Sequence, residues 1–267
     1  MEDGRDWGKF MLPYEQAVEE LKVKFKLLRL ELKNREEYSP IEFVTGRVKQ
    51  VSSIFEKAKR LQVPMDKIEE GIEDIAGIRI MCQFVQDIHR VAEYIRERKD
   101  LQIVNEKDYI THKKESGYRS YHIIVRYPVQ TALGMKHVLG EIQIRTLAMN
   151  FWATIEHSLN YKYKQSLPED VRIRLQKAAE AAFLLDQEMS SIRKDIVEAQ
   201  KLFEDKSGLV ADILNDIQEL YFYHKVIEAQ AFQLRFSQLW SEDDFYNLKQ
   251  LSGEIHEVLF MARKEEL

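Results

Sequence analysis

The sequence predicts an α+β fold in which a mixed β-sheet is surrounded by helices and followed by a helical C-terminal extension. Apolar runs typical of strands are confined to residues 78–146, whereas the segments on both sides repeat apolar residues at helical spacing. Glycine and proline are scarce, at 10 and 5 in 267 residues, which favours long regular elements with few turns. Strands in the middle with helices on both sides predict a sheet layered with helices.

Two helices are predicted before the sheet. Residues 13–33 carry apolar side chains at helical spacing from Val18 to Leu28, and Pro13 suits the first turn of a helix. Residues 50–61 read as a second, basic helix that ends before a proline. We expect both helices to lie around the sheet.

Four strands are predicted, at residues 78–84, 101–108, 120–129 and 136–146. A helical segment joins the first two, which indicates a strand–helix–strand unit. The last two are joined by a short connection containing Gly134, which indicates an antiparallel hairpin. A sheet that contains both kinds of connection is mixed.

The chain turns helical again after the last strand, and a long charged helix is predicted at residues 170–206. Ser207-Gly208 is the best boundary in the sequence, because the residues after it are denser in aromatics. We therefore expect a main domain at residues 1–206 and a helical extension at 207–267. The extension could pack on the main domain or on a partner subunit, and the sequence does not reveal its role.

Composition limits the classes of function. The net charge of −5 gives no global attraction to nucleic acid, so a site for a polyanion has to be a local basic cluster. The single cysteine, Cys82, excludes an internal disulfide and fits a reducing cytosol. The apolar runs are too short to span a membrane, and the polar N-terminus is unlike a secretory signal. These features predict a cytoplasmic protein.

The stretch "GEIQIRT", which ends the last predicted strand, has one unusually functional face. Side chains alternate along a strand, so Glu141, Gln143 and Arg145 share one face and Ile142 and Ile144 the other. A wet strand face normally carries simple solvating residues. An acid, an amide and a guanidinium in a row are instead typical of a site.

Two carboxylates are the candidate ligands of a metal ion. Asp74 comes just before the first predicted strand, and Glu141 lies within the last. On neighbouring elements of one sheet they could share Mg²⁺, which prefers carboxylate oxygens and keeps waters and substrate phosphates as its other ligands. From the charge pattern alone, two solvent-facing acids among 45 remain the simpler interpretation.

Basic residues around the predicted sheet favour a phosphate ligand. Arg47, Lys57 and Arg60 lie around the 50–61 helix, and Ser53 is near its N-terminus, where backbone N–H groups favour anions. Further cations lie on or next to the strands: Arg79, Lys113, Lys114, Arg119 and Arg145. A solvated basic face is the alternative, but cations beside two acids favour a site for polyphosphate and metal.

A tyrosine in a basic loop is the candidate platform for a base. In "HKKESGYRSYH", Gly117 permits a tight turn and Tyr118 follows it, so its ring could stack on a nucleobase. Most tyrosines in such positions are packing residues. His122 is open to two interpretations, as a proton donor or phosphate contact, or as a satisfied strand residue.

These segments together resemble a known family. "EDIAGIRI", "SGYRSYH", "GEIQIRTLAMNFWATIEHSLNYKY" and "SPIEFVTGRVK" resemble the synthetase domain of the RelA/SpoT family, and most closely its small stand-alone alarmone synthetases of the RelQ type. The resemblance extends to about Lys206. The chain contains no His-Asp dipeptide, so the hydrolase half of the long family members is not expected.

The resemblance implies an ATP:GTP 3′-diphosphotransferase, which moves the β,γ-pyrophosphate of ATP to the 3′-hydroxyl of GDP or GTP and makes the alarmone of the stringent response. By motif, Asp74 and Glu141 would hold Mg²⁺, and Glu141 would activate the hydroxyl. The residues implied for ATP are Arg47, Ser53, Lys57, Arg60 and Arg79. Those implied for GDP or GTP are Tyr118, Lys114, His122 and Gln143, with Tyr118 stacked on guanine.

The resemblance also implies a homotetramer whose central cleft binds the product and stimulates synthesis. The residues that match this cleft are Lys22, Lys26, Phe43, Thr45 and Asn150. For the two lysines, a plain solvated helix face is the interpretation that periodicity alone prefers.

Two other functions stay open at this stage. A nucleotidyltransferase with another acceptor would keep Asp74 and Glu141 but would not need Tyr118 to stack on guanine. An RNA-binding regulator would use the basic helices and exposed aromatics, and single-stranded RNA could also be a second ligand of a synthetase. The sequence does not rank GDP, GTP and GMP as acceptors.

Overall fold

The computed structural model describes residues 6–162 and 168–265. The chain forms two compact units, Met1–Ser191 and Ile192–Leu267. Within the described ranges, no helix combines the length and the apolar character that a membrane span requires.

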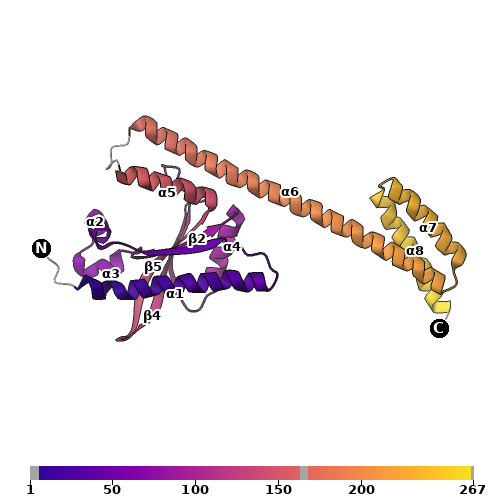
Figure 1. The fold of residues 1–267 in the computed structure, drawn as a ribbon, viewed down its shortest axis with the longest axis horizontal. Coiled ribbons are helices and arrows are strands. Elements are labelled where there is room, and N and C mark those ends of the chain that lie inside the picture. Colours follow the sequence, from indigo (N-terminus) through magenta and orange to yellow (C-terminus); the bar gives the residue numbers. More distant parts are fainter. Residues whose placement is uncertain (1–5, 163–167, 266–267) are drawn as a thin grey trace. The chain divides into compact units, whose positions relative to one another are not determined.

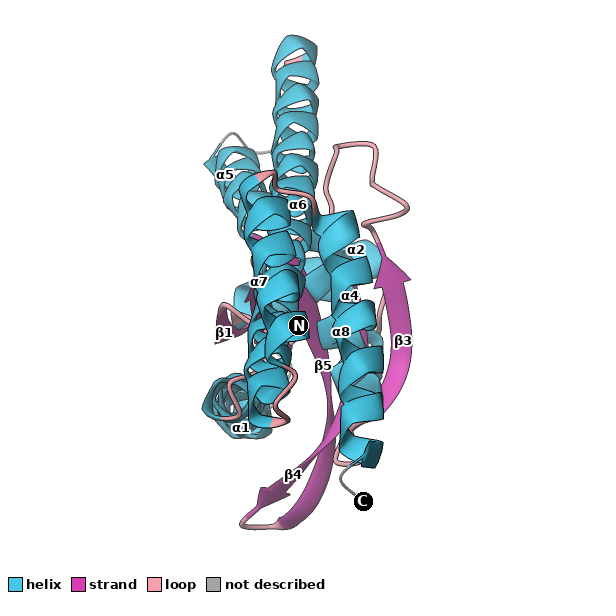
Figure 2. Cartoon of the chain, turned by 90° about the vertical axis from the view of Figure 1, so that its right-hand side faces the viewer, coloured by secondary structure: helices cyan, strands magenta, loops and turns pink. Residues whose placement is uncertain are grey.

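The first unit is built on a five-stranded mixed sheet with the strand order β1-β2-β5-β4-β3. The strands are β1 (Phe43–Val48), β2 (Ala76–Cys82), β3 (Gln102–Asp108), β4 (Tyr121–Thr131) and β5 (Gly134–Thr146). β2 is parallel to β5, and the other neighbouring pairs are antiparallel. The mixed sheet and the β4–β5 hairpin are therefore confirmed, and Figure 2 shows the hairpin as two long strands.

Helices cover both faces of this sheet. They are α1 (Trp7–Asn34), α2 (Val51–Leu61), α3 (Ile68–Gly71), α4 (Val85–Arg96) and α5 (Leu147–Lys162), with a short 3-10 helix, η1 (Met65–Lys67), before α3. In Figure 1, α1 lies on one side of the sheet and α5 on the other. The buried faces of α1 and α4 form one hydrophobic core with the apolar face of the sheet. The opposite face of the sheet carries the polar side chains Glu141, Gln143 and Arg145 of β5.

Three details of the first unit differ from the sequence predictions. α1 begins at Trp7, capped by Asp6, so Pro13 lies inside the helix as a buried residue and not in its first turn. β2 and β3 flank the same helix but are separated in the sheet by β5 and β4. β1 was not predicted. Its weak strand pattern includes Gly46, where a Cβ atom would lie 2.7 Å from Val18 Cγ1, so α1 can pack only against a glycine.

The single thiol of the sequence is buried. Cys82 lies in the core, and burial raises the pKa of its thiol well above the usual value. A thiol that stays protonated is a poor nucleophile, so Cys82 is a packing residue.

The second unit is a bundle of helices with a core of its own. Helix α6 (Glu169–Phe222) is followed by α7 (Val226–Ser241) and α8 (Phe245–Glu265). Ile213, Ile217 and Leu220 of α6 pack with residues of α7 and α8 in a separate core. The helical extension is thus confirmed. Ser207 and Gly208, the boundary expected from the sequence, lie inside α6, so the division of roles at this point stays a prediction.

A buried carboxyl joins α6 to the start of α5 within the first unit. The Thr146 hydroxyl donates to Asp186 Oδ2 at 2.6 Å, and Thr146 Oγ1 in turn accepts from the Met149 N–H at 3.1 Å. Burial raises the pKa of Asp186 to about 6. Below about pH 6 the folded chain therefore keeps Asp186 protonated. The stability that comes from this protonation is fully present below the ordinary pKa of an aspartate and is lost as the pH rises through about 6.

We predict that Asp186→Asn stabilises the protein more at pH 8 than at pH 5. The amide keeps an acceptor for Thr146 but carries no charge, so its advantage over wild type should grow by about 1 kcal/mol between these pH values. Thermal unfolding at both pH values, with the exposed Glu188→Gln as control, measures the change. An equal effect at both pH values would contradict the role of the buried charge.

Candidate active site

Strand β5 is the middle strand of the sheet, and its side chains alternate between the two faces. Ile142 and Ile144 are completely buried in the core below the sheet. Glu141, Gln143 and Arg145 lie on the opposite face, as the alternation along the strand predicts. The strand that the sequence singled out is therefore the base of the candidate site.

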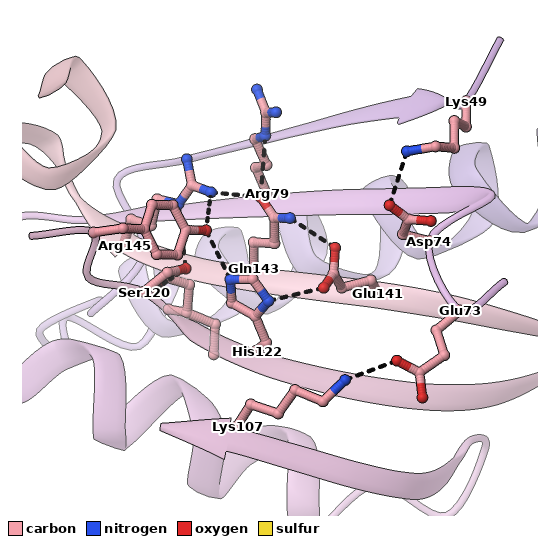
Figure 3. Close-up of polar contacts among 12 residues, drawn as sticks. Lys49, Glu73, Asp74, Arg79, Lys107, Ser120, His122, Glu141, Gln143 and Arg145 are labelled. Carbon is pink, nitrogen blue, oxygen red and sulfur yellow. Dashed lines mark hydrogen bonds and ion pairs between the residues drawn. The ribbon is translucent and has the colours of Figure 1, made fainter. Parts of the chain in front are cut away.

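Neighbouring strands bring two more polar groups level with Gln143. Arg79 of β2 and His122 of β4 are its partners in the register on either side. The Arg79 Nε donates to Gln143 Oε1 at 3.4 Å. Figure 3 shows these side chains in one layer on the sheet. Three neighbouring strands, β2, β5 and β4, thus build one polar surface.

Glu141 is held by two hydrogen bonds. His122 Nδ1 lies 2.8 Å from its Oε1, and Gln143 Nε2 donates to its Oε2 at 2.7 Å. Burial alone would raise the pKa of Glu141, but the hydrogen bonds from His122 and Gln143 and the charge of Lys57 lower it to about 2. Glu141 is consequently a carboxylate near neutral pH and can accept a proton.

Asp74 lies between two lysines just before β2. Its Oδ2 is 2.9 Å from Lys49 Nζ, and its Oδ1 is 2.9 Å from Lys57 Nζ. Burial works to raise the pKa of Asp74, but the two ammonium groups outweigh it and lower the pKa. Two cations thus hold this carboxylate in its charged form, close to Glu141.

A cleft opens above these groups. A pocket of about 100 Å³ is lined by Arg47, Asp74, Arg79, Glu141 and Gln143, among others. A larger cleft of about 550 Å³ shares these side chains and continues to α5. The further predicted residues that line the larger cleft are Arg60, Lys114, Tyr118, His122 and Arg145. A pocket of about 390 Å³ in the second unit, between α7 and α8, contains none of these groups.

Tyr118 lines the cleft with cations close to its ring. Lys114 Nζ and the Arg145 guanidinium each lie 5.0 Å from the ring centre. The Tyr118 hydroxyl is 2.8 Å from His122 Nε2. Burial raises the pKa of the Tyr118 phenol and lowers that of the Lys114 ammonium. Gly117 has φ +86°, which confirms the tight turn expected before Tyr118.

Guanidinium groups crowd the part of the cleft next to β1 and β2. Arg47 of β1 lies one strand away from Arg79 of β2. Burial lowers the pKa of Arg79, and repulsion from Arg145 and Arg47 adds to this effect. Like charges held this close in a partly buried site favour an anionic ligand between them.

The remaining predicted donor residues lie on α2. Lys57 reaches the site through its ion pair with Asp74, and Arg60 lines the larger cleft. Ser53 lies in the first turn of α2, and neither cleft includes it in its lining. The structure therefore brings Lys57 and Arg60 to the site but does not bring Ser53 into the lining of either cleft.

The residues predicted for a product cleft lie on both sides of β1. Phe43 and Thr45 alternate with Val44, which is buried in the core, and Thr45 lines the smaller pocket. Lys22 and Lys26 come from α1, which packs on the core side. The fifth, Asn150, lies in the first turn of α5.

Sequence reasoning missed several side chains of the site. Lys49, just after the end of β1, pairs with Asp74. It lies two residues after Arg47, so alternation indicates a shared face but not the pairing. Tyr109 lies 5.2 Å from the His122 ring, ring centre to ring centre. Glu156 and His157 of α5 line the cleft, and no spacing rule separates them from an ordinary helix face.

Comparison with known proteins identifies the family. A protein-family model, described as the region found in RelA / SpoT proteins, matches residues 46–166 of this chain. GTP pyrophosphokinase YjbM of Bacillus subtilis (strain 168) is 60% identical over 204 residues, which cover 76% of this chain and 96% of that protein. GTP pyrophosphokinase YwaC of the same organism is 39% identical over 193 residues, which cover 72% of this chain and 92% of that protein.

Solved structures agree. The small alarmone synthetase 1 from Bacillus subtilis bound to its product pppGpp has a TM-score of 0.69 at 62% identity, over 71% of this chain and 97% of that chain. The same enzyme bound to AMPCPP has a TM-score of 0.65 at 57% identity, over 72% of this chain and 98% of that chain. Since relatives match over nearly their whole length and the family model spans the polar face described above, this chain belongs to the RelA/SpoT family, among its small alarmone synthetases.

Proposed function

We propose that this protein transfers the β,γ-pyrophosphate of ATP to the 3′-hydroxyl of GDP or GTP, giving AMP and guanosine tetra- or pentaphosphate. The observation that carries the proposal is a deprotonated Glu141 beside Asp74 and its two lysines, in a cleft rich in arginine. The names of the relatives, GTP pyrophosphokinases, support the same reaction.

The chemistry needs a base at the acceptor hydroxyl. The 3′-oxygen attacks the β-phosphorus of ATP, the bond from that phosphorus to the α,β-bridging oxygen breaks, and AMP leaves. Glu141 takes the proton of the hydroxyl, a step that typically contributes about 10²–10⁴-fold to the rate. Its hydrogen bonds to His122 and Gln143 orient the carboxylate for this task.

ATP, the pyrophosphate donor, is proposed to bind in the part of the cleft that contains Arg47 and Arg79. Arg47 and Arg79 are proposed to enclose the adenine, and Lys57, Arg60 and Ser53 to hold the phosphates. Burial lowers the pKa of Arg79 and repulsion from Arg145 and Arg47 adds to it; a polyphosphate placed among these cations would relieve the repulsion. Charge that develops on the phosphoryl oxygens in the transition state is stabilised by the same cations.

The site also fits a divalent cation. Asp74 and Glu141 line the same pocket, and a pair of carboxylates is the usual protein contribution to Mg²⁺, which completes its shell with water and phosphate. The ion pairs of Asp74 with Lys49 and Lys57 show that this carboxylate is charged and interacts with cations. Mg²⁺ held by Asp74 and Glu141 would neutralise phosphate charge.

The acceptor end is proposed to bind the guanine nucleotide. Tyr118 would stack on the base, and Lys114, His122 and Gln143 would line the ribose and phosphates. The ring of Tyr118 lies at the cleft with Lys114 above it, which suits a negatively charged nucleotide.

Assembly and regulation belong to the same proposal. Phe43 is 41% exposed on the edge strand β1, beside Thr45, a position suited to contact with a second subunit. A homotetramer with product bound by Lys22, Lys26, Phe43, Thr45 and Asn150, a cytosolic location and binding of single-stranded RNA stay predictions from the resemblance.

Glu141→Gln should abolish synthesis without unfolding the protein. The amide cannot accept the proton of the hydroxyl, so the rate should fall at least about 100-fold. Anion-exchange chromatography after incubation with ATP, GDP and Mg²⁺ measures AMP and guanosine tetraphosphate, which should form in equal amounts with wild type. Glu93→Gln, on the far side of the sheet, is the matched control. A Glu141→Gln variant with more than about a tenth of wild-type activity would refute the assignment of the base.

Asp74→Asn should raise the Mg²⁺ concentration required for half-maximal activity. Its neighbour Glu73 pairs with Lys107 at 2.8 Å and not with the lysines of the site, so Glu73→Gln is a control one residue away. We expect about a 10-fold or greater rise for Asp74→Asn, since one charged oxygen ligand is lost, and little change for Glu73→Gln. Equal Mg²⁺ dependence of the two variants would exclude Asp74 as a ligand.

A further inference from the structure

Arg145 is a buried cation, 5% exposed, at the end of β5. In the described part of the chain its hydrogen-bond partners are three neutral side chains. Its Nη2 donates to the Tyr118 hydroxyl at 2.5 Å and to Gln143 Oε1 at 2.8 Å, and its Nε donates to Ser120 Oγ at 3.2 Å. Burying a guanidinium is costly, so its position calls for an explanation.

One chain of hydrogen bonds runs from Arg145 through an aromatic pair. A guanidinium can only donate, so the Tyr118 oxygen accepts and its own O–H is directed to His122 Nε2, 2.8 Å away. With Nε2 as acceptor, neutral His122 carries its proton on Nδ1. That N–H donates to Glu141 Oε1 at 2.8 Å.

A second chain runs from the same nitrogen through the amide. Gln143 Oε1 accepts from Arg145 Nη2 at 2.8 Å and, over a longer distance of 3.4 Å, from Arg79 Nε, so Arg145 is the closer of the two donors that fix the orientation of this amide. Its Nε2 is then directed to Glu141 Oε2 at 2.7 Å. Both oxygens of Glu141 are thus acceptors at the ends of chains that begin at one guanidinium (Figure 3).

We propose that Arg145 is a positioning residue for the acceptor half of the site, because it fixes the direction of both hydrogen-bond chains that end on Glu141. The proposal rests on the proposed function, in which Tyr118, His122 and Gln143 line the acceptor nucleotide. Arg145 itself touches no reacting atom. Lysine would not replace it, because an ammonium group on a flexible stem lacks the planar fork that reaches two partners at once.

Steady-state kinetics of Arg145→Met and Arg145→Lys test this role. For Arg145→Met we expect kcat to fall about 10–100-fold and the KM for GDP to rise about 10-fold, with the KM for ATP within about 3-fold of wild type. Arg145→Lys should recover only part of the loss. Arg126→Met, at an exposed position of β4, is the control. An equal rise in both KM values would overturn the proposal, since Arg145 would then act on the donor as well.

A double-mutant cycle tests whether Arg145 acts through Tyr118. Tyr118→Phe keeps the ring for stacking and removes only the hydroxyl that links Arg145 to His122. If the hydrogen-bond chain through Tyr118 is present in wild type, the fold-decrease in kcat/KM of the double variant should be well below the product of the two single decreases. Losses that multiply would show that the two residues act independently and would overturn the proposal.

A third measurement does not depend on the reaction. Nitrogen-15 NMR of the histidines in the ligand-free protein, at one fixed pH, should find His122 protonated on Nδ1. In Arg145→Met the two tautomers should mix, and an unchanged tautomer would overturn the proposal. The signal is assigned from its loss in His122→Gln. If wild type transferred no pyrophosphate, the proposed function would fail, while this spectrum would still decide the role of Arg145. Should Arg145→Met not fold, Arg145→Lys and Tyr118→Phe give the same test.

Discussion

The two-sided alternation of β5 is the constraint on which the rest of this structure depends. Ile142 and Ile144 enter the core formed with α1 and α4, and this fixes the register of the strand between β2 and β4. A shift of one residue would exchange the isoleucines with Glu141 and Gln143, which the buried face cannot accept. The free energy that holds the core therefore also places the site.

Charge balance is the second constraint, and it explains why so many cations are tolerated in one cleft. Asp74 is shared by two lysines, and the buried Arg145 is satisfied by three hydroxyl or amide oxygens. Burial, together with repulsion from Arg145 and Arg47, lowers the pKa of Arg79 in spite of the nearby Glu141. The part of the cleft assigned to the triphosphate is thus the part where positive charge is in excess, as electrostatic preorganisation requires.

The sequence alone predicted those elements that are determined by the alternation of side chains or by a turn residue. The β4–β5 hairpin and the polar face with Glu141 follow from alternation and from Gly134. β1 was missed because Gly46 weakens its pattern, and only the close approach of α1 explains that glycine. The continuity of α6 through Gly208 was also not foreseen, since 54 residues of helix override the local cost of one glycine. Pairings such as Lys49 with Asp74 depend on tertiary structure, and no spacing predicts them.

The relation of the two units to the chemistry follows from where the site residues lie. Every side chain that lines the two clefts falls between Thr45 and His157, so the first unit supplies the whole of the proposed site. The helices α7 and α8 close a core of their own with α6, joined by ion pairs such as Arg263 with Glu219. A segment with a hydrophobic core of its own does not depend on the sheet of the first unit for its fold. The second unit is therefore a separately folded addition to the unit that carries the proposed site.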